Sequence, residues 1–330
     1  MLAFEQLTVG YQHRRQRSII LQDVTASVVA GELVGLVGPN GVGKSTLLRS
    51  VAGLQPFFTG SVTVMGKPLK SLSKKQRARR MAAVLTDRFE PGRLSVRDVV
   101  GLGRFAHSSW TGRLTAADRS VVDRCLELAG AQDLADRLIG ELSDGQRQRV
   151  MVARGLAQEP RILLLDEPTA FLDPPGRVAL FELLRKLSEE LAMAVVVCTH
   201  DIEIALRYAD SLWVADRSRE LIVGSPEQLA YDGHLGKSFQ APGVELDLDS
   251  LAFVAVRDDL PKARVAGEAD AAAMAKHCLV RAGFELVADA DAEVTLSVTA
   301  SAGRWTMTPP GLAVTDLGEL YERARDISNG

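Results

Sequence analysis

The sequence predicts an α/β fold followed by a smaller α+β unit, and three observations carry this prediction. Short apolar runs typical of buried strands alternate with helical stretches from Met1 to about Leu229. A turn-rich polar stretch, Tyr231–Gly243, comes next. Strand-like and helix-like patterns then resume from Leu251 onwards. The expected organisation is one α/β domain over residues 1–230, a linker over 231–250 and an accessory α+β domain over 251–330.

Composition limits the classes of protein that fit. The chain has 330 residues, of which 46% are hydrophobic and 25% charged, and these values are typical of about two globular domains. A formal net charge of −3 argues against a dedicated nucleic-acid binder. The most apolar stretch, Ala192–Cys198, is far shorter than a bilayer span, and the first ten residues do not resemble a signal peptide. The three widely spaced cysteines indicate reduced thiols, so we expect an intracellular protein whose membrane part, if any, belongs to a partner.

A phosphate-binding loop follows the first buried strand run, Gly31–Gly38. The loop matches the pattern G-x-x-x-x-G-K-[ST], and a helical run comes directly after it. Its glycines allow backbone N–H groups to surround phosphate oxygens, the lysine supplies a positive charge, and the serine hydroxyl is a Mg²⁺ ligand. The predicted ATP-binding residues are Gly38, Pro39, Asn40, Gly41, Val42, Gly43, Lys44, Ser45 and Thr46.

Polar residues end two further strand runs. The run Ile162–Asp166 is followed by Glu167, so Asp166 is placed to hold Mg²⁺ and Glu167 to accept a proton from the attacking water, or to orient it. An acidic turn without function is the alternative for these two carboxylates. His200 ends the run that begins at Ala194. Parallel strands present their carboxyl ends to one crevice, so we expect His200 beside Asp166, where it can hydrogen-bond a phosphate.

A third motif contains Ser143, which lies 23 residues before Asp166. Leu142-Ser143-Asp144-Gly145-Gln146 resembles the LSGGQ signature of the ATP-binding cassette (ABC) ATPases. The motif combines a helix N-terminus with a small hydroxyl and a glycine, and such a terminus is an anion site. The alternative is an ordinary helix cap. The resemblance covers about residues 1–229. It implies a P-loop cassette with a RecA-like core and a helical signature subdomain over about 95–150.

The resemblance also implies further roles. Tyr11 matches the aromatic residue that stacks on adenine, Asp173 lies in the D-loop, and His200 is the switch histidine. Two cassettes form a head-to-tail homodimer. Each ATP then lies between Lys44 of one copy and the helix of Ser143, Gly145 and Gln146 in the other.

Two positions depart from the family pattern. Asp144 stands where glycine is usual, so its carboxylate must point away from phosphate or ATP-driven closure weakens. The glutamine of the Q-loop is missing. Thr86 is the best positional match for it, and Thr86 or Asp87 is the expected substitute.

Leu94–Gly130 resembles the helical region of the ATPases that import ferric siderophores, haem and cobalamin, through Gly101, Gly103, Arg104 and His107. The resemblance implies an ATPase at the cytoplasmic face of the cell membrane, peripheral to it. Its partners are integral-membrane permease subunits and, through them, a substrate-binding protein; no nucleic acid is expected. ATP and Mg²⁺ are the implied cofactors, and an iron-siderophore is the first expectation for the substrate.

Other functions stay open at this point. One is a soluble ABC ATPase acting on nucleic acid or ribosomes, although no long coiled coil separates the two nucleotide motifs. Another is a cassette that imports a different small solute. The basic run Lys70–Arg80 fits a solvated helix face better than a nucleic-acid or lipid patch. The accessory domain is either a regulatory or a dimer-stabilising module.

Overall fold

The computed structural model describes residues 1–13, 16–85, 93–107, 113–248, 250–256, 260–287, 294–301, 303–309 and 311–329. The chain forms two compact units, Met1–Val254 and Ala255–Gly330. The first unit contains every motif that the sequence analysis assigned to nucleotide chemistry.

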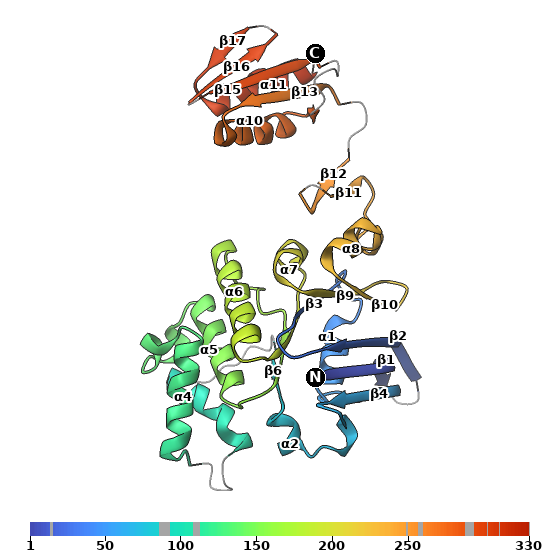
Figure 1. Ribbon diagram of the computed structural model, residues 1–330, viewed down its shortest axis with the longest axis vertical. Coiled ribbons are helices and arrows are strands. Elements are labelled where there is room, and N and C mark those ends of the chain that lie inside the picture. Colours follow the sequence, from blue (N-terminus) through green and yellow to red (C-terminus); the bar gives the residue numbers. More distant parts are fainter. Residues whose placement is uncertain are drawn as a thin grey trace. The chain divides into compact units, whose positions relative to one another are not determined.

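The centre of the first unit is a six-stranded sheet in the order β10-β9-β3-β8-β7-β6 (Figure 1). Its strands from β9 to β6 are parallel, and β10 is antiparallel to β9. β3, β7 and β8 are buried at every position. The carboxyl ends of the parallel strands therefore meet at one edge, where a ligand crevice is expected. The strands are β3 (Leu33–Val37), β6 (Met81–Val84), β7 (Ile162–Asp166), β8 (Ala194–Cys198), β9 (Ser211–Ala215) and β10 (Leu221–Gly224).

Alternate residues of the central strands enter two different apolar cores. Leu163 and Val195 belong to a core shared with α5 and α6. Leu164 and Val196 belong to a core shared with α1 and a second sheet. Both faces of the central sheet are therefore covered, which explains its unbroken apolar runs. The helices beside it are α1 (Lys44–Val51), α5 (Asp144–Leu156), α6 (Pro174–Glu190) and α7 (Ile202–Tyr208).

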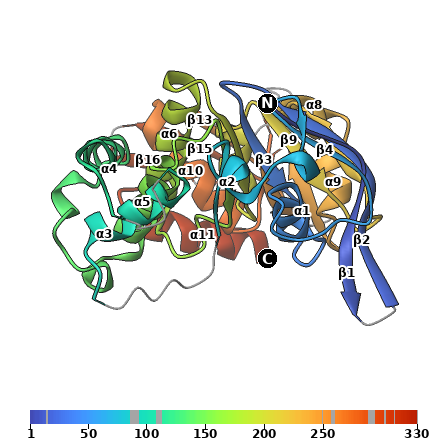
Figure 2. The ribbon, with the colours of Figure 1, turned by 90° about the horizontal axis from the view of Figure 1, so that it is seen from below.

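The second sheet is antiparallel, in the order β2-β1-β4-β5. β1 and β2 pair from Leu2 with Val28 to His13 with Gln16. This sheet and the helical part from α3 (Val96–Gly101) to α5 lie on opposite sides of the central sheet in both ribbon views (Figure 2). Its elements are β1 (Leu2–His13), β2 (Gln16–Val28), β4 (Thr59–Val64) and β5 (Lys67–Pro68), followed by the short helices η1 (Leu69–Ser71) and α2 (Lys74–Ala78).

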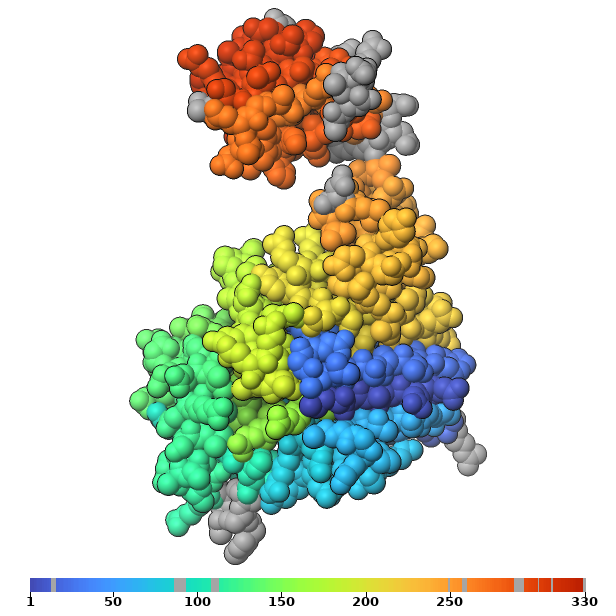
Figure 3. Space-filling view, in the orientation of Figure 1, coloured from blue at the N-terminus to red at the C-terminus, as the bar shows by residue number. Residues whose placement is uncertain are grey.

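A helical part completes the cassette. Ser95, Thr115 and Ser143 each begin a helix there with a capping box, in which the side chain accepts from the third helical N–H. Its space-filling surface forms a green lobe, separated from the blue antiparallel strands by the yellow-green central region (Figure 3). The elements are α3 (Val96–Gly101), η2 (Leu102–Ala106), α4 (Ala116–Leu128), η3 (Gln132–Leu134), η4 (Ile139–Glu141) and α5.

Arg104 ties this helical part together from inside. The buried guanidinium donates to Asp118 at 2.9 Å, to Glu159 at 2.7 Å and to the carbonyl of Ala157 at 2.8 Å. The hydroxyl and N–H of Thr115, together with Arg104, lower the pKa of Asp118 to about 2. His107 bonds the carbonyl of Gln158 at 2.8 Å. The run Gly101–His107, which resembled importer cassettes in the sequence, is thus packed through Arg104 and His107 rather than exposed as a ligand site.

The segment predicted as a linker is partly folded onto the first unit. Leu235 is fully buried among residues such as Val37 and Leu229, and Leu251 and Phe253 pack against the same cluster. The ring centroids of Phe239 and Phe253 are 5.7 Å apart. The apolar residues of this segment stand singly among turn-forming residues, so the local sequence pattern does not predict this packing. The elements are α8 (Pro226–Tyr231), α9 (His234–Ser238), β11 (Val244–Asp247) and β12 (Ala252–Ala255).

In the described residues, the second unit is a five-stranded sheet in the order β14-β13-β15-β16-β17, with two helices. Apolar residues of the sheet, such as Val298 and Met307, form one core with α10 and α11 residues such as Leu279 and Leu320. The indole N–H of Trp305 donates to the carbonyl of Ala271 at 2.9 Å. The elements are β13 (Lys262–Gly267), α10 (Ala269–Arg281), β14 (Glu285–Leu286), β15 (Leu296–Ser301), β16 (Arg304–Thr308), β17 (Leu312–Val314) and α11 (Leu317–Asn329).

The cysteines are buried free thiols. Burial raises the pKa of Cys125 to about 11 and that of Cys198 well above its usual value, so neither thiol is a reactive nucleophile at neutral pH. Within the described residues, no group of three or more His, Cys, Asp and Glu side chains is arranged to hold a metal ion. None of the helices in the described part of the chain is long and apolar enough to cross a bilayer.

Candidate functional site

The phosphate-binding loop connects β3 to α1 through three glycines with positive φ. Gly38, Gly41 and Gly43 have φ values of 149°, 81° and 105°. A Cβ on Gly38 would lie 2.2 Å from the carbonyl oxygen of Ala215, and one on Gly43 would lie 2.1 Å from Ile20. Glycine is therefore required at both positions, as the sequence motif predicted. The loop turns its backbone toward the N-terminus of α1, where free N–H groups attract anions.

The loop lines a cavity of about 310 Å³. Lys44 is 6% exposed, and its ammonium donates to the carbonyls of Gly38 at 2.8 Å and Pro39 at 3.2 Å. The positive charge is therefore held inside the loop, where a phosphate group would enter. The cavity is lined by Tyr11, Ile20, Asn40, Gly41, Gly43, Lys44, Ser45, Thr46 and Glu167.

Ser45 and Asp166 meet although 121 residues separate them. The Ser45 hydroxyl donates to a carboxylate oxygen of Asp166 at 2.7 Å, and Asp166 is 3% exposed at the carboxyl end of β7. A hydroxyl and a carboxylate are the oxygen ligands that Mg²⁺ takes in protein sites together with substrate phosphates. The side chains present therefore fit a Mg²⁺ ion bound with a nucleotide at this edge.

Glu167 and His200 form the second polar contact of the edge. Nδ1 of His200 lies 2.6 Å from Oε2 of Glu167, and the two side chains are 47% and 20% exposed respectively. Glu167 has a φ of 49°, a conformation that is rare for a residue with a side chain. Its N–H donates to the carbonyl of Cys198 at 2.9 Å, which holds this unusual backbone against β8. Strain of this kind is concentrated at functional sites.

Tyr11 reaches the same cavity from β1. Its hydroxyl lies 2.8 Å from the hydroxyl of Thr46, and the side chain is 53% exposed. The ring is thus available for stacking while the phenol oxygen is already anchored to the phosphate loop. This contact spans 35 residues and joins the antiparallel sheet to α1.

The signature residues lie elsewhere on the same unit. Ser143 caps α5: its hydroxyl accepts from the N–H of Gln146 at 3.3 Å, and the Gln146 side chain accepts from the Ser143 N–H at 3.1 Å. Gly145 lies in the same helical turn. The carboxylate of Asp144 lies 3.8 Å from Arg147, one turn further on. None of these residues is among those that line the phosphate-loop cavity.

Of the remaining predicted site residues, the structure describes Asp173 but not Thr86. Asp173 caps α6 by accepting from the N–H of Gly176 at 3.0 Å. Thr86, the predicted substitute for the missing glutamine, lies outside the described residues together with Asp87. The role proposed for Thr86 therefore stays a prediction.

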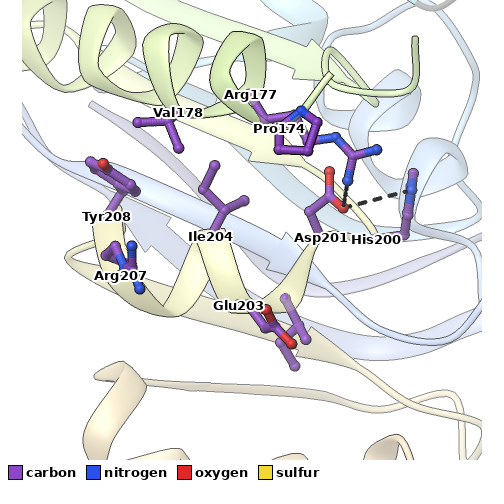
Figure 4. A pocket seen from close by; sticks show the side chains of 10 residues that line it. Pro174, Arg177, Val178, His200, Asp201, Glu203, Ile204, Arg207 and Tyr208 are labelled. Carbon is purple, nitrogen blue, oxygen red and sulfur yellow. Dashed lines mark hydrogen bonds and ion pairs between the residues drawn. The ribbon is translucent and has the colours of Figure 1, made fainter. Parts of the chain in front are cut away.

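The structure adds a pair of residues that the sequence analysis did not single out. Arg177 and Asp201 form an ion pair at 2.8 Å beside His200, at one end of a groove between α6 and α7 (Figure 4). Two signals for this pair existed in the sequence. Arg177 follows Asp173 by one helical turn, and Asp201 directly follows His200. Neither signal indicates that the two side chains meet.

Comparison with family models divides the chain in two parts. A model described as "ABC transporter" matches residues 21–170, which include the phosphate loop, the signature residues and Glu167. A model described as "Iron ABC transporter C-terminal domain" matches residues 261–325, within the second unit.

Known proteins and structures resemble this chain over about two thirds of its length. The chain is 40% identical over 229 residues to an uncharacterized ABC transporter ATP-binding protein, MJ0873, of Methanocaldococcus jannaschii, with 69% of this chain and 78% of that protein covered. It is 38% identical over 208 residues to the iron(3+)-hydroxamate import ATP-binding protein FhuC of Bacillus subtilis, with coverages of 63% and 76%. The solved dimeric structure of the bacterial ABC transporter cassette MJ0796 superimposes with a TM-score of 0.60 at 29% identity, covering 68% of this chain and 99% of that one.

Proposed function

Because this chain belongs to the ABC transporter family and has its ATPase cassette fold, we propose that it hydrolyses ATP to energise the import of a metal chelate through a separate membrane permease. The observation that carries the substrate class is the match of residues 261–325 to an iron ABC transporter C-terminal domain. The similarity of the cassette to an iron(3+)-hydroxamate import protein supports the same class. An iron-siderophore is the first candidate, with haem and cobalamin as further chelates.

The nucleotide is proposed to bind at the phosphate loop. Backbone N–H groups of residues 40–46 and the ammonium of Lys44 would surround the β- and γ-phosphates, and the ring of Tyr11 would stack on adenine. Ser45 and Asp166 would hold Mg²⁺, which when bound neutralises charge on the phosphate oxygens. The 2.7 Å contact between Ser45 and Asp166 supports this assignment, because it brings the two ligand types to one point.

Hydrolysis is assigned to Glu167 and His200. The carboxylate of Glu167 would orient a water molecule and accept its proton while the water oxygen bonds to the γ-phosphorus and the bond to the leaving ADP oxygen breaks. His200, 2.6 Å from that carboxylate, would hold it in place and hydrogen-bond the γ-phosphate. The positive φ of Glu167 supports the role, since strained backbone conformations are concentrated at functional sites.

A head-to-tail homodimer would complete each nucleotide site. The helix N-terminus with Ser143, Gly145 and Gln146 lies away from the phosphate-loop cavity of its own chain, so a second copy must supply it. The dimeric solved cassette with the same fold supports this arrangement. Nucleotide would then join the two copies, and hydrolysis would release them.

The remaining partners are integral-membrane permease subunits and, through them, a substrate-binding protein. The chain would lie at the cytoplasmic face of the cell membrane as a peripheral subunit. The permease would contact the surface near residues 86–97. The import proteins among the relatives support this placement.

A reconstitution experiment tests the proposal. The full chain would be purified with its permease from detergent-solubilised membranes, and the co-purifying subunits identified by mass spectrometry. In proteoliposomes, uptake of an iron-siderophore should require ATP and should be lost with Lys44→Ala. ATP hydrolysis that RNA, DNA or ribosomes stimulate, without a co-purifying permease, would replace the import proposal by the soluble-ATPase alternative. Uptake of a different solute would keep the ATPase role and change the substrate.

A further inference from the structure

The Arg177 side chain connects two loops that leave the central sheet at neighbouring strands. Its Nε–H donates to the carbonyl oxygen of Leu172 at 3.0 Å, and its Nη1–H donates to the carboxylate of Asp201 at 2.8 Å. Leu172 belongs to the loop after β7, and Asp201 to the loop after β8. In Figure 4 the guanidinium extends from α6 toward Asp201, and His200 lies beside the same carboxylate. One planar group therefore bonds two segments that are 29 residues apart in the chain.

In forming the ion pair with Arg177, Asp201 does not cap the helix α7 that follows it. Asp201 is the residue that precedes α7, but its side chain makes no capping hydrogen bond. Aspartate is among the best N-caps, so an unused carboxylate at this position costs stability. The second carboxylate oxygen, Oδ2, is buried without a hydrogen-bond partner among the described residues. The Asp201 carboxylate thus binds Arg177 instead of capping its own helix. The stability of α7 does not explain this arrangement.

The two connected loops carry the proposed hydrolytic residues. Glu167 begins the first loop and His200 lies beside Asp201 in the second, with Nε2 of His200 4.0 Å from the Asp201 carboxylate. Two buried hydroxyls, of Thr169 and Thr199, form a second connection at 3.3 Å between the same loops. The 2.6 Å contact of Glu167 with His200 therefore depends on how these loops are held relative to each other.

We propose that Arg177 is a positioning residue for ATP hydrolysis: by joining Leu172 to Asp201 it holds the loop of Glu167 against the loop of His200. The proposal rests on the roles proposed above for Glu167 and His200. Arg177 itself lines the groove between α6 and α7, which has a volume of about 420 Å³, and is not among the residues that line the phosphate-loop cavity. It acts on the rate of the chemical step and not on nucleotide binding.

Because Arg177 does not line the phosphate-loop cavity, its loss should affect kcat more than ATP binding. Charge-assisted hydrogen bonds made by a guanidinium fork are strong and geometrically specific, so their loss should loosen the loops and lower kcat about 10-fold or more. KM for ATP should change less than about 2-fold, because the phosphate loop keeps its contacts. Arg177→Lys keeps the charge but not the fork, and should lie between wild type and Arg177→Ala.

The chain provides a matched control on the same helix. Arg185 in α6 also joins the helix to an acidic residue of another segment, Asp210, at 2.5 Å. Its side chain is 34% exposed, against 35% for Arg177. The ion pairs of Arg185 are to Glu189 and Asp210, and neither of these residues belongs to a loop of the site. Arg185→Ala therefore removes an equivalent structural contact without touching the hydrolytic residues.

The experiment measures steady-state ATPase activity, melting temperature and binding of a fluorescent ATP analogue for the full chain. The variants are Arg177→Ala, Arg177→Lys, Asp201→Asn, the double variant Arg177→Ala with Asp201→Asn, and Arg185→Ala. If the pair acts as a unit, the double variant should be no slower than the slower single variant. Analogue binding should stay within about 2-fold of wild type in all of them.

Three results are decisive. Equal kcat values for Arg177→Ala and Arg185→Ala overturn the proposal, and so does a loss of ATP affinity as large as the loss of kcat. Additive effects in the double variant also overturn it, because they exclude a shared unit. Where Arg177→Ala does not fold, the same comparison is made with Arg177→Lys and Asp201→Asn. A wild-type chain that hydrolyses no ATP contradicts the proposed function instead, so the two failures are distinguishable.

Discussion

The carboxylate of Glu167 lies 2.6 Å from the imidazole of His200, although 33 residues separate them in the chain. The contact forms because β7 and β8 are adjacent and parallel, so the residues that follow them leave the sheet at the same edge. Glu167 adopts a positive φ there, and its N–H is bonded to the end of β8. The relationship is therefore a property of the sheet order.

Replacing Glu167 by glutamine tests its role as the group that activates water. Glu167→Gln keeps the size of the side chain but removes the basic carboxylate, so kcat should fall about 100-fold to 10 000-fold. ATP binding should persist, and the bound nucleotide should trap a dimer. Steady-state ATPase assays and size-exclusion chromatography with ATP measure both effects. Rapid turnover in this variant would contradict the assignment.

Lys44→Ala should act on a different step. Lys44 is the buried cation of the phosphate loop, and its removal leaves the phosphates without that charge. Nucleotide binding itself should be lost, in contrast to Glu167→Gln. Equilibrium titration with a fluorescent ATP analogue provides the comparison. The exposed Lys74 of α2 is a suitable control, since Lys74→Ala should bind as the wild type does.

Asp144 should weaken the ATP-dependent dimer. Its carboxylate stands at the first position of α5, is 57% exposed, and lies 3.8 Å from the guanidinium of Arg147. If this helix terminus faces a phosphate of the second copy, the negative charge opposes closure. Asp144→Gly in the Glu167→Gln background should therefore lower the dimer dissociation constant about 3-fold to 10-fold, as measured by analytical ultracentrifugation. Asp133→Asn, in the same helical part, serves as the control, and an unchanged constant for Asp144→Gly would show that the helix terminus faces no anion.

The buried cluster around Arg104 should make stability depend on acid pH. The hydroxyl and N–H of Thr115 and the guanidinium of Arg104 lower the pKa of Asp118 from 3.8 to about 2. A carboxyl group whose pKa is lowered by folding stabilises the protein above its unfolded value, and this contribution is lost as the pH falls from about 4 to about 2. Asp118→Asn should cost roughly 1–3 kcal/mol at neutral pH. Urea unfolding at pH 7 and pH 3 should show a smaller difference between wild type and variant at pH 3, and an equal difference would contradict the assignment.

Two truncations distinguish the folded boundary from the one that local patterns predicted. A chain ending at Val254 keeps β11 and all of β12 except Ala255, so its cassette should fold and bind ATP as the full chain does. A chain ending at Gln240 loses Leu246, Leu251 and Phe253, which cover the apolar cluster around Leu235. Each removed contact exposes apolar surface at a cost of about 25 cal/mol per Å². The shorter chain should melt at a lower temperature in a thermal shift assay, and equal melting temperatures would contradict the packing role of the segment.

Local sequence patterns were sufficient to predict the parts of the site that are formed by adjacent residues. The glycines of the phosphate loop, the strand that ends in Asp166 and Glu167, and the cap of α5 at Ser143 all form from contiguous segments. Each is specified by a short-range requirement: a positive φ, an unbroken apolar run or a capping box. The resemblance to the ABC ATPases rests on these same segments, and the family comparisons confirmed it.

Tertiary structure decided how distant side chains meet. The motifs assigned Ser45 and Asp166 to one Mg²⁺ site, but their hydrogen bond across 121 residues, and that of Arg177 to Asp201 across 24, are seen only in the structure. Such contacts depend on the order of strands in the sheet and on the direction of each helix above it, and neither is encoded in a local pattern. The burial of Leu235 within a turn-rich segment has the same cause, since its cluster includes residues of β3, β9 and α7. The sequence by itself therefore determined the nucleotide chemistry, and the packing of strands and helices determined how its two hydrolytic loops are joined.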